Sequence, residues 1–259
     1  MRRFYFFGGV IAILFLLAAW AVLERPLGVA AREGQALRVH VALVLFPFLA
    51  ALSAFGAARA YRPEDRERRV WLGLSGAFLL WTLGRVAFAF QHYRGMGGRS
   101  PEGDVFTAAF FVVVLAAVGD EVRRIRGLGL LTRPQLVFLA VAGFAVLALG
   151  IALFLRPLLG QSPSTARDLL GLLFAFLAVL LVPLGLAPAV AFLGGRWSYA
   201  WGLFSVGMLC LAVGLMWLVH AVFYGTWFEG HPGNLFEMAG FALLAAGGVW
   251  HEAILRMEG

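Results

Sequence analysis

Long apolar runs, separated by short polar segments, recur along the whole chain. A helix needs ~20 mostly apolar residues to cross ~30 Å of hydrocarbon, and eight runs come close to or exceed that length. They cover residues 4–23, 39–60, 70–90, 105–119, 135–155, 169–192, 198–222 and 234–255. None alternates apolar and polar residues as a transmembrane β-strand does. The pattern predicts an all-α, polytopic transmembrane helix bundle of about eight spans, in a single domain over residues 1–259.

The sequence does not fix three of the boundaries of these spans. The fourth run is short and can extend back through Asp104. The sixth contains Pro183 and Pro188, which predict a kink or an early end because proline removes a helical hydrogen bond. The seventh span is separated from the sixth only by residues 194–197, so a seven-span bundle is an alternative.

Composition supports the membrane interpretation and excludes several classes of function. Hydrophobic residues make up 62% of the chain and charged residues 14%, whereas a soluble domain carries about a quarter charged residues. The polar segments are too short for an appended kinase, cyclase or nucleotide-binding domain, and no phosphate loop or dinucleotide fingerprint occurs. Nucleic-acid binding is not expected, because no basic soluble region exists to carry it.

The distribution of arginine predicts the orientation of the bundle. The chain has no lysine, so all 21 basic residues are arginines. With the N-terminus in the cytoplasm, 13 arginines fall on the cytoplasmic side and 7 outside, while Arg85 lies within a span. The positive-inside rule then places both termini in the cytoplasm. The all-arginine usage, with abundant alanine, glycine and leucine, suggests a GC-rich bacterial genome, so we expect the bacterial cytoplasmic (inner) membrane.

Arg85 is the first candidate for a functional residue, because an ionisable side chain within hydrocarbon is costly. It lies about 15 residues into the third span, in its outer third. We consider two interpretations. Arg85 pairs with a carboxylate and lines a site, or its side chain extends to the outer interface, where the guanidinium meets water.

Four further polar residues share roughly the depth of Arg85. They are His40, Asp104, His220 and Glu237. Together they predict an outward-facing ligand-binding pocket near the outer leaflet, with His92 and His231 beside it and aromatic residues along its walls. The aromatic residues are Trp81, Tyr93, Tyr224 and Trp227. The alternative is that each polar residue lies at the wet interface and the aromatic residues form an ordinary interfacial belt.

Cofactor chemistry is constrained by the histidines and by the missing lysine. A bis-histidine haem needs two axial histidines at one depth. His40 and His220 meet this condition and His251 does not, but interfacial histidines are common, so we do not expect haem. Retinal bound through a Schiff base is excluded, because it needs a lysine amine. His251 is either a ligand or proton carrier, or half of a helix-end pair with Glu252. No metal site is expected, and the cofactor is otherwise unknown.

Small residues recur in two of the predicted spans. Ala140, Gly143 and Gly150 follow one stripe of the fifth span. In the eighth span, Ala239, Ala242 and Ala246 share a face. Such faces allow close helix approach. We therefore expect the eighth span to pack tightly, within the chain or against another subunit.

One region resembles a known family. It runs from Trp81 and Gly84 late in the third span, through Ser100 and Pro101, to Asp104 before an aromatic-rich helix that ends in arginines. This arrangement resembles the multi-span membrane sensor regions of bacterial diguanylate cyclases and related signalling proteins, here without the output domain. The resemblance implies that Asp104 corresponds to the family's loop aspartate. It also implies a stand-alone sensory module that acts through a partner.

Three functional hypotheses follow. The first is a membrane sensory or ligand-binding module that acts through another membrane or signalling protein and recognises an apolar or quinone-like molecule. The second is an accessory subunit of an electron-transfer or light-harvesting complex. The third is an intramembrane lipid-modifying enzyme that uses Asp104, Glu237 or the histidines, although no catalytic motif is present.

Overall fold

Eight helices make up the described part of the chain, which in this computed structural model covers residues 2–24, 34–94, 101–152, 166–228 and 230–258. The helices are α1 (Arg2–Leu23), α2 (Gln35–Ala60), α3 (Arg66–Tyr93), α4 (Pro101–Gly127), α5 (Arg133–Gly150), α7 (Ala166–Ala191), α8 (Arg196–Phe223) and α9 (Gly233–Glu258). All eight are long and apolar enough to cross a bilayer. The predicted all-α bundle of eight helices, each long and apolar enough to be a span, is therefore confirmed.

The two uncertain spans are both continuous helices. The fourth extends beyond its apolar run at both ends. Glu102 and Asp104 lie in its first turn and Arg124 and Arg126 in its last, where the helix dipole stabilises charges of these signs. The sixth continues through both of its prolines to Ala191. The early end that those prolines predicted is therefore wrong. The fifth is predicted to reach residue 155, and residues 153–155 lie outside the described residues.

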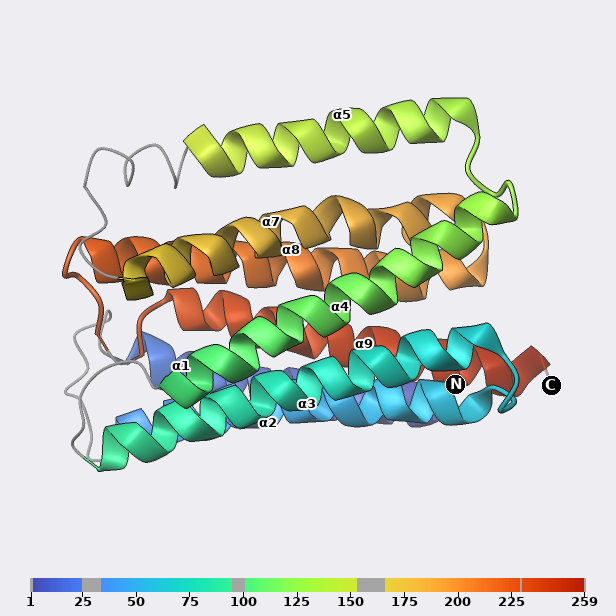
Figure 1. Cartoon of the computed structure of the whole chain (residues 1–259). Helices are drawn as coiled ribbons and strands as arrows, with labels where there is room; N and C mark the ends of the chain where they lie inside the picture. The colour runs from blue at the N-terminus through green and yellow to red at the C-terminus, as the bar shows by residue number, and fades with distance from the viewer. Residues whose placement is uncertain (1, 25–33, 95–100, 153–165, 229, 259) are drawn as a thin grey trace.

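The weakest predicted boundary is a true break between helices. Helix α7 ends at Ala191, and α8 begins at Arg196. Gly194 lies in the connection with a φ of 86°, a left-handed conformation that glycine adopts without strain. The seven-span alternative is excluded. With an even number of crossings, α1 begins and α9 ends at the same end of the bundle (Figure 1). We call this the terminal end, and the other the far end.

The helices form a packed centre with two peripheral members. Helices α2, α3, α4, α7, α8 and α9 contact one another in sequence, α1 lies against α9 and α2, and α5 packs mainly against α7 (Figure 1). The small residues of α5 face α7, since Gly143 lies against Pro183 and Gly150 against Val179. Most other residues of α5 are exposed, with Phe144 at 74%. Its outer face is therefore available to lipid.

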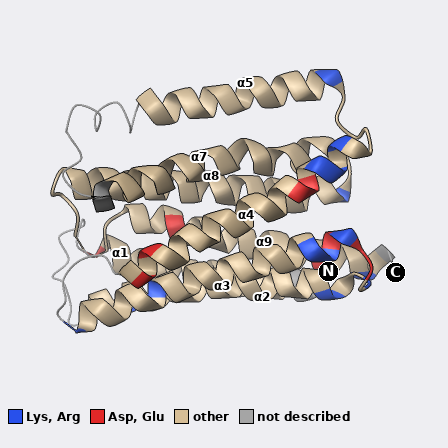
Figure 2. Cartoon of the chain, in the orientation of Figure 1, with Lys and Arg blue, Asp and Glu red and all other residues tan. Residues whose placement is uncertain are grey.

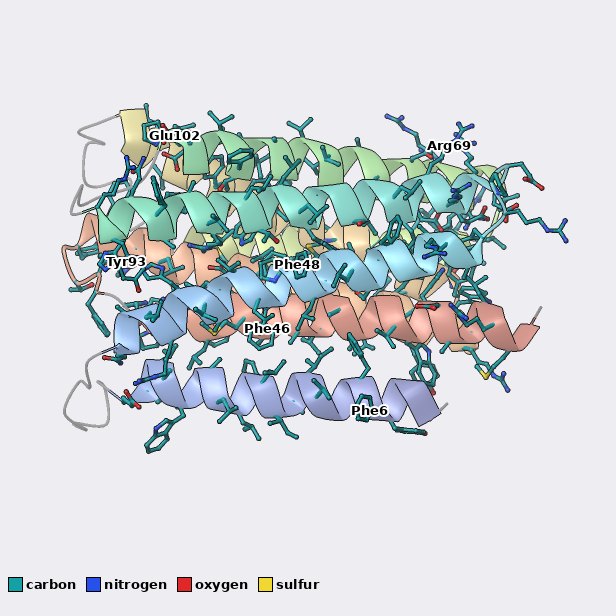
Figure 3. All side chains as sticks on the ribbon, turned by 90° about the horizontal axis from the view of Figure 1, so that it is seen from below. Phe6, Phe46, Phe48, Arg69, Tyr93 and Glu102 are labelled. Atoms are coloured by element: carbon teal, nitrogen blue, oxygen red, sulfur yellow. The ribbon has the colours of Figure 1, made fainter. Side chains whose placement is uncertain are left out.

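The outward faces of the helices are as apolar as their inward faces. Phe46 of α2 is buried, whereas Phe48, two residues further on, is 40% exposed, and the two side chains leave the helix in different directions (Figure 3). Phe6 of α1 is 74% exposed (Figure 3). Charged side chains gather instead at the two ends of the bundle (Figure 2). This distribution is the one that a hydrocarbon surrounding requires.

Helices α8 and α9 make the closest contact in the bundle, through small residues spaced seven apart on each helix. The facing pairs are Gly207 with Gly240, Gly214 with Gly233, and Ala200 with Gly247. On a neighbouring face of α9, Gly248 lies against Ser53 of α2. The eighth predicted span therefore packs tightly within the chain. The close contacts are made by Gly233, Gly240, Gly247 and Gly248 and not by the predicted face of Ala239, Ala242 and Ala246.

Candidate functional site

A buried ion pair joins α3 and α9 in the half of the bundle nearer the far end. The Glu237 side chain is 1% exposed and accepts a hydrogen bond from Nε of Arg85 at 2.6 Å and another from Nη2 of Arg85. Nε1 of Trp81 donates a third bond to the same carboxylate at 2.9 Å. Of the two interpretations of Arg85, pairing with a carboxylate is the one observed.

Close backbone packing and aromatic rings hold this ion pair. A Cβ atom on Gly214 of α8 would lie 3.0 Å from the backbone nitrogen of Glu237, so α8 packs directly against the α9 backbone at this residue. The Arg85 guanidinium lies 5.5 Å from the Trp81 ring and 5.9 Å from the Phe88 ring. Since the carboxylate already accepts three hydrogen bonds, the pair is a satisfied polar network within the bundle.

The other predicted site residues, His40, Asp104 and His220, lie on α2, α4 and α8. The ring of His40 contacts His92 at 5.1 Å and Tyr93 at 6.0 Å, at the junction of α2 and α3. The ring centroid of His220 lies 4.3 Å from that of Tyr224, the residue that caps the end of its helix. Asp104 is buried in the first turn of α4. Hydrogen bonds join Arg85 to Glu237, and the charge of Arg85 also acts on the ring of His40. One ligand-binding pocket formed by all five predicted residues stays a prediction.

The aromatic residues expected to line an outer pocket do not all enclose one. Trp81 is buried beside Glu237, but Tyr93, Tyr224 and Trp227 are 56%, 41% and 50% exposed. These three behave as interfacial residues. The structure instead contains a lined cavity at the opposite end of the bundle.

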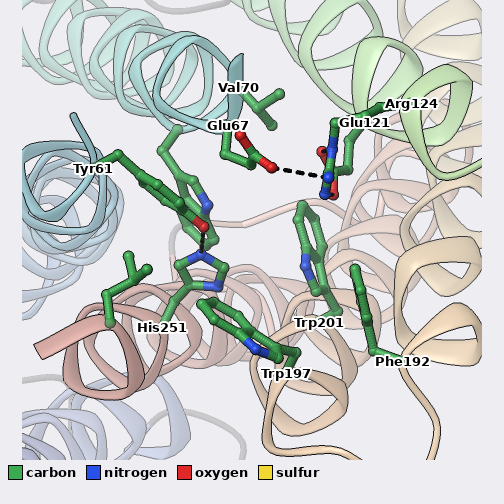
Figure 4. Close-up of a pocket in the computed structure, with 11 residues that line it drawn as sticks. Tyr61, Glu67, Val70, Glu121, Arg124, Phe192, Trp197, Trp201 and His251 are labelled. Carbon is green, nitrogen blue, oxygen red and sulfur yellow. Dashed lines mark hydrogen bonds and ion pairs between the residues drawn. The ribbon is translucent and has the colours of Figure 1, made fainter. Parts of the chain in front are cut away.

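A cavity of about 200 Å³ lies at the terminal end, where six chain segments meet (Figure 4). Helices α3, α4, α8 and α9 contribute most of its wall, and the connections after α2 and α7 complete it. Its lining residues are Tyr61, Glu67, Val70, Trp71, Glu121, Arg124, Phe192, Trp197, Trp201, His251 and Leu255. We call it the aromatic cavity, because three tryptophans and a tyrosine supply much of its surface.

His251 is the centre of the aromatic contacts in this cavity. It is 2% exposed, and its Nε2 lies 2.6 Å from the Tyr61 hydroxyl (Figure 4). Its ring centroid is 4.3 Å from that of Trp71, 4.6 Å from Trp197 and 6.4 Å from Trp201. Among the described residues, Nδ1 of His251 has no hydrogen-bond partner. The imidazole is therefore held by one hydrogen bond and by aromatic packing.

Two glutamates and one arginine form the polar wall of the cavity. Arg124 donates to Glu121 from Nε at 2.9 Å and from Nη2 at 2.6 Å. Its Nη1 lies 2.8 Å from Oε1 of Glu67 (Figure 4). Burial raises the pKa of the Tyr61 phenol, and the negative charges of Glu67 and Glu121 raise it further. The phenol is therefore neutral and can donate its proton to Nε2 of His251.

Local sequence explains how these side chains reach the cavity. Tyr61 caps the C-terminus of α2 in an extended conformation, and the turn after it is tied by a bond from the Arg62 N–H to Asp65 at 2.8 Å. Trp197 and Trp201 are four residues apart at the start of α8, so both project from one face. The same spacing places His251 and Leu255 together on α9.

The aromatic cavity is the part of the site that sequence reasoning did not find. From the sequence, His251 was either a ligand or proton carrier, or half of a pair with Glu252. Glu252 instead pairs with Arg256 at 2.6 Å and lies against Gly56 of α2, while His251 turns into the cavity. The tryptophan pair at the start of α8 was the available signal. Within the described residues, no group of histidine, cysteine or acidic side chains is arranged to hold a metal ion.

Comparison of the chain with protein-family models, with curated proteins and with solved structures finds no match. The resemblance to diguanylate cyclase sensor regions therefore stays a prediction. Inferences about function depend on the geometry of the site.

Proposed function

We propose that this chain is a multi-pass protein of the bacterial cytoplasmic membrane that binds a small molecule in the aromatic cavity and acts through a partner as a sensory or ligand-binding module. The observation that carries the proposal is the cavity itself. Six segments of the chain converge on it, and its walls combine apolar rings with a few fixed polar groups. This combination is typical of small-molecule sites.

The proposal places the cavity and both termini in the cytoplasm. Among the described side chains, the arginines at the terminal end are Arg59, Arg62, Arg66, Arg68, Arg69, Arg123, Arg124, Arg126, Arg133, Arg196 and Arg256, against Arg38, Arg85 and Arg94 toward the far end. The positive-inside rule favours the terminal end as cytoplasmic. The proposed ligand site is therefore moved from the outer leaflet, where the sequence suggested it, to the cytoplasmic ends of the helices.

The geometry gives less support to a lipid-modifying enzyme. A catalytic carboxylate must reach its substrate, but Glu237 is buried and already accepts bonds from Arg85 and Trp81. Asp104 is also buried, 8% exposed. The polar groups predicted from sequence therefore serve the packing of the bundle better than they serve a reaction.

Filling the cavity tests the proposal. Val70 lines the cavity and is 2% exposed, so Val70→Phe should occupy the space of a ligand. Native mass spectrometry of protein extracted in a mild detergent should show a bound small molecule in the natural chain and its loss in the variant. Val112→Phe, on a side chain of α4 that is 68% exposed, is the matched control. Identical bound species in all three proteins, or none in any, would count against a site in the cavity.

Cysteine labelling tests the orientation separately. Cys210 is the single native cysteine, so Cys210→Ala gives a background free of thiols. Leu128→Cys at the terminal end and Trp227→Cys at the far end replace side chains that are 60% and 50% exposed. A maleimide that does not cross membranes should label position 227 in intact cells and position 128 only after lysis. The reverse pattern would contradict the orientation.

A further inference from the structure

We propose that the aromatic cavity recognises a small organic cation, specifically a methylated ammonium group. This inference deepens the proposed ligand-binding function and rests on it. Three properties of the cavity lead to it: the aromatic faces, the net charge of the polar wall, and the volume.

The aromatic faces supply the first argument. Trp71 and Trp201 are 3% and 2% exposed, and Trp197 and Tyr61 complete the ring of π-systems around the space (Figure 4). The face of an aromatic ring attracts a cation through its quadrupole, and tryptophan does so most strongly. The attraction increases when the cation is removed from water, and the buried tryptophans of the cavity provide that condition.

The polar wall carries a net negative charge. Glu67 and Glu121 contribute two negative charges, and Arg124 contributes one positive charge. Nε, Nη1 and Nη2 of Arg124 all contact the two glutamates, so its guanidinium is already paired with their carboxylates. A cation entering the cavity gains from the remaining charge, while an anion is repelled by it.

The environment of Tyr61 reflects the same three charges. The two glutamates raise the pKa of its phenol by more than Arg124 lowers it. The potential at the Tyr61 hydroxyl is therefore negative, whereas at the buried ring of His251 the positive charge of Arg124 acts with the opposite sign. Of the eleven arginines at this end, Arg124 is the one among the lining residues. Arg66 and Arg256 are mostly exposed and paired with Asp120 and Glu252, and salt largely screens exposed charges beyond ~8 Å at physiological ionic strength.

The volume limits the size of the ligand. Pockets for drug-sized molecules measure roughly 300–1,000 Å³, and this one measures about 200 Å³. A compact group such as trimethylammonium fits this class of space better than an extended molecule does. The group can belong to a free quaternary ammonium compound or to a lipid head group.

Choline and its neutral isostere, 3,3-dimethylbutan-1-ol, separate charge from shape. Each is titrated into protein purified in a maltoside detergent, with tryptophan fluorescence and thermal stability as readouts. We expect choline to bind at least about tenfold more tightly than the isostere, and sodium butyrate to show no binding. Equal binding of choline and the isostere would overturn the cation inference and leave the proposed ligand-binding function standing. Absence of all binding, together with no bound molecule in native mass spectrometry, would remove both.

A variant pair tests the polar wall. Glu67→Gln removes the charge of a side chain that is 30% exposed and keeps an oxygen for Arg124, so it should weaken choline binding severalfold without changing binding of the isostere. Glu64→Gln, in the exposed turn before α3, is the control and should leave choline binding unchanged. Equal choline affinity in the natural chain and in Glu67→Gln would contradict the assigned role of the charge.

Lipid nanodiscs distinguish the two sources of the cation. Free choline is titrated into protein in dimyristoyl phosphatidylcholine and, separately, in dimyristoyl phosphatidylglycerol. Weaker choline binding in phosphatidylcholine indicates that the head group already occupies the cavity, and equal binding indicates a free cation. Both results uphold the cation inference, whereas choline binding in neither lipid would overturn it for the membrane-embedded protein.

Discussion

Gly207 of α8 and Gly240 of α9 pack backbone against backbone, so that a Cβ atom added to either would lie 2.8 Å from the carbonyl oxygen of the other. Real Cβ atoms essentially never approach so closely, and the helices must separate to accept even an alanine. Because the contact repeats at seven-residue intervals along both helices, a change at this position should affect the whole α8–α9 interface.

Gly207→Ala should therefore destabilise the protein. We expect a loss of ~1–3 kcal/mol, the usual cost of forcing extra atoms into a packed interface. Gly202→Ala on the same helix is the control, since no atom lies within 4 Å of its Cβ position. Alanine there should be neutral or stabilising by up to ~1 kcal/mol, because it favours helix more than glycine does. The unfolding midpoint in sodium dodecyl sulfate measures both, and equal effects would contradict the close contact.

The Arg85–Glu237 pair predicts opposite results for single and double substitution. Glu237→Ala leaves a buried arginine without its partner, which costs ~3–5 kcal/mol, whereas replacing both residues by apolar side chains is close to neutral. We therefore expect Arg85→Leu combined with Glu237→Leu to recover most of the stability lost in Glu237→Ala.

An exposed ion pair provides the control for this experiment. Arg66 and Asp120 lie 3.0 Å apart with side chains 59% and 32% exposed, and such pairs contribute at most ~1 kcal/mol. Arg66→Met should thus change the unfolding midpoint little. A double variant as unstable as Glu237→Ala would show that the charges themselves are required by the fold.

Removing the Tyr61 hydroxyl should weaken the connection between α2 and α9. Tyr61→Phe leaves Nε2 of the buried His251 without a hydrogen bond, and an unsatisfied buried group costs ~1–3 kcal/mol. Tyr199→Phe, at a side chain that is 68% exposed, should have no measurable effect. A double-mutant cycle with His251→Phe measures the coupling directly, and additive effects of the two substitutions would contradict the bond.

His231 predicts a loss of stability in acid. Burial lowers the pKa of His231 below its ordinary value of 6.5, and its Nδ1 accepts a bond from the Gly233 N–H at 3.1 Å, which requires that this nitrogen be unprotonated. Above pH 6.5, neither the folded nor the unfolded state is charged at this residue. As the pH falls below that value, the unfolded state binds the proton first, so stability decreases until the folded pKa is also passed.

An asparagine at position 231 tests the titration of the side chain separately from its hydrogen bond. The side-chain oxygen of His231→Asn can accept the bond from the N–H two residues on but does not titrate. Melting temperatures measured from pH 8 to pH 5 should therefore fall less in the variant than in the natural chain. Parallel curves would show that His231 does not contribute to the acid sensitivity.

The eight crossings could be predicted from sequence because bilayer thickness fixes the length of each apolar run. Even the break before α8 was visible as residues 194–197. The sequence did not show which face of each helix is directed toward the interior of the bundle, because lipid and protein interior are equally apolar. Phe46 and Phe48 cannot be told apart by hydrophobicity, yet only Phe46 is buried.

Residues of the candidate site that place a charge in hydrocarbon could be predicted from the sequence. Residues that belong to the site only because distant segments meet in space could not. Arg85 and Glu237 were found because charge in hydrocarbon is expensive, and their pairing is a direct consequence. Tyr61 and His251 are 190 positions apart, and nothing in either segment shows that α2 and α9 are neighbours. The aromatic cavity could therefore be recognised only once the helices were arranged in space.

The distance between Arg85 and Glu237 along the chain has a consequence for biogenesis. A ribosome adds ~5–20 residues per second, so the 152 residues that separate the pair require roughly 8–30 s of synthesis. During that interval α3 carries an arginine whose partner carboxylate, that of Glu237, has not yet been synthesised. An unpaired arginine costs ~2.5–3.5 kcal/mol on the scales measured for translocon insertion. A nascent chain that stops before α9 keeps this charge uncompensated, and we expect such truncated chains to stay with insertion factors or be degraded.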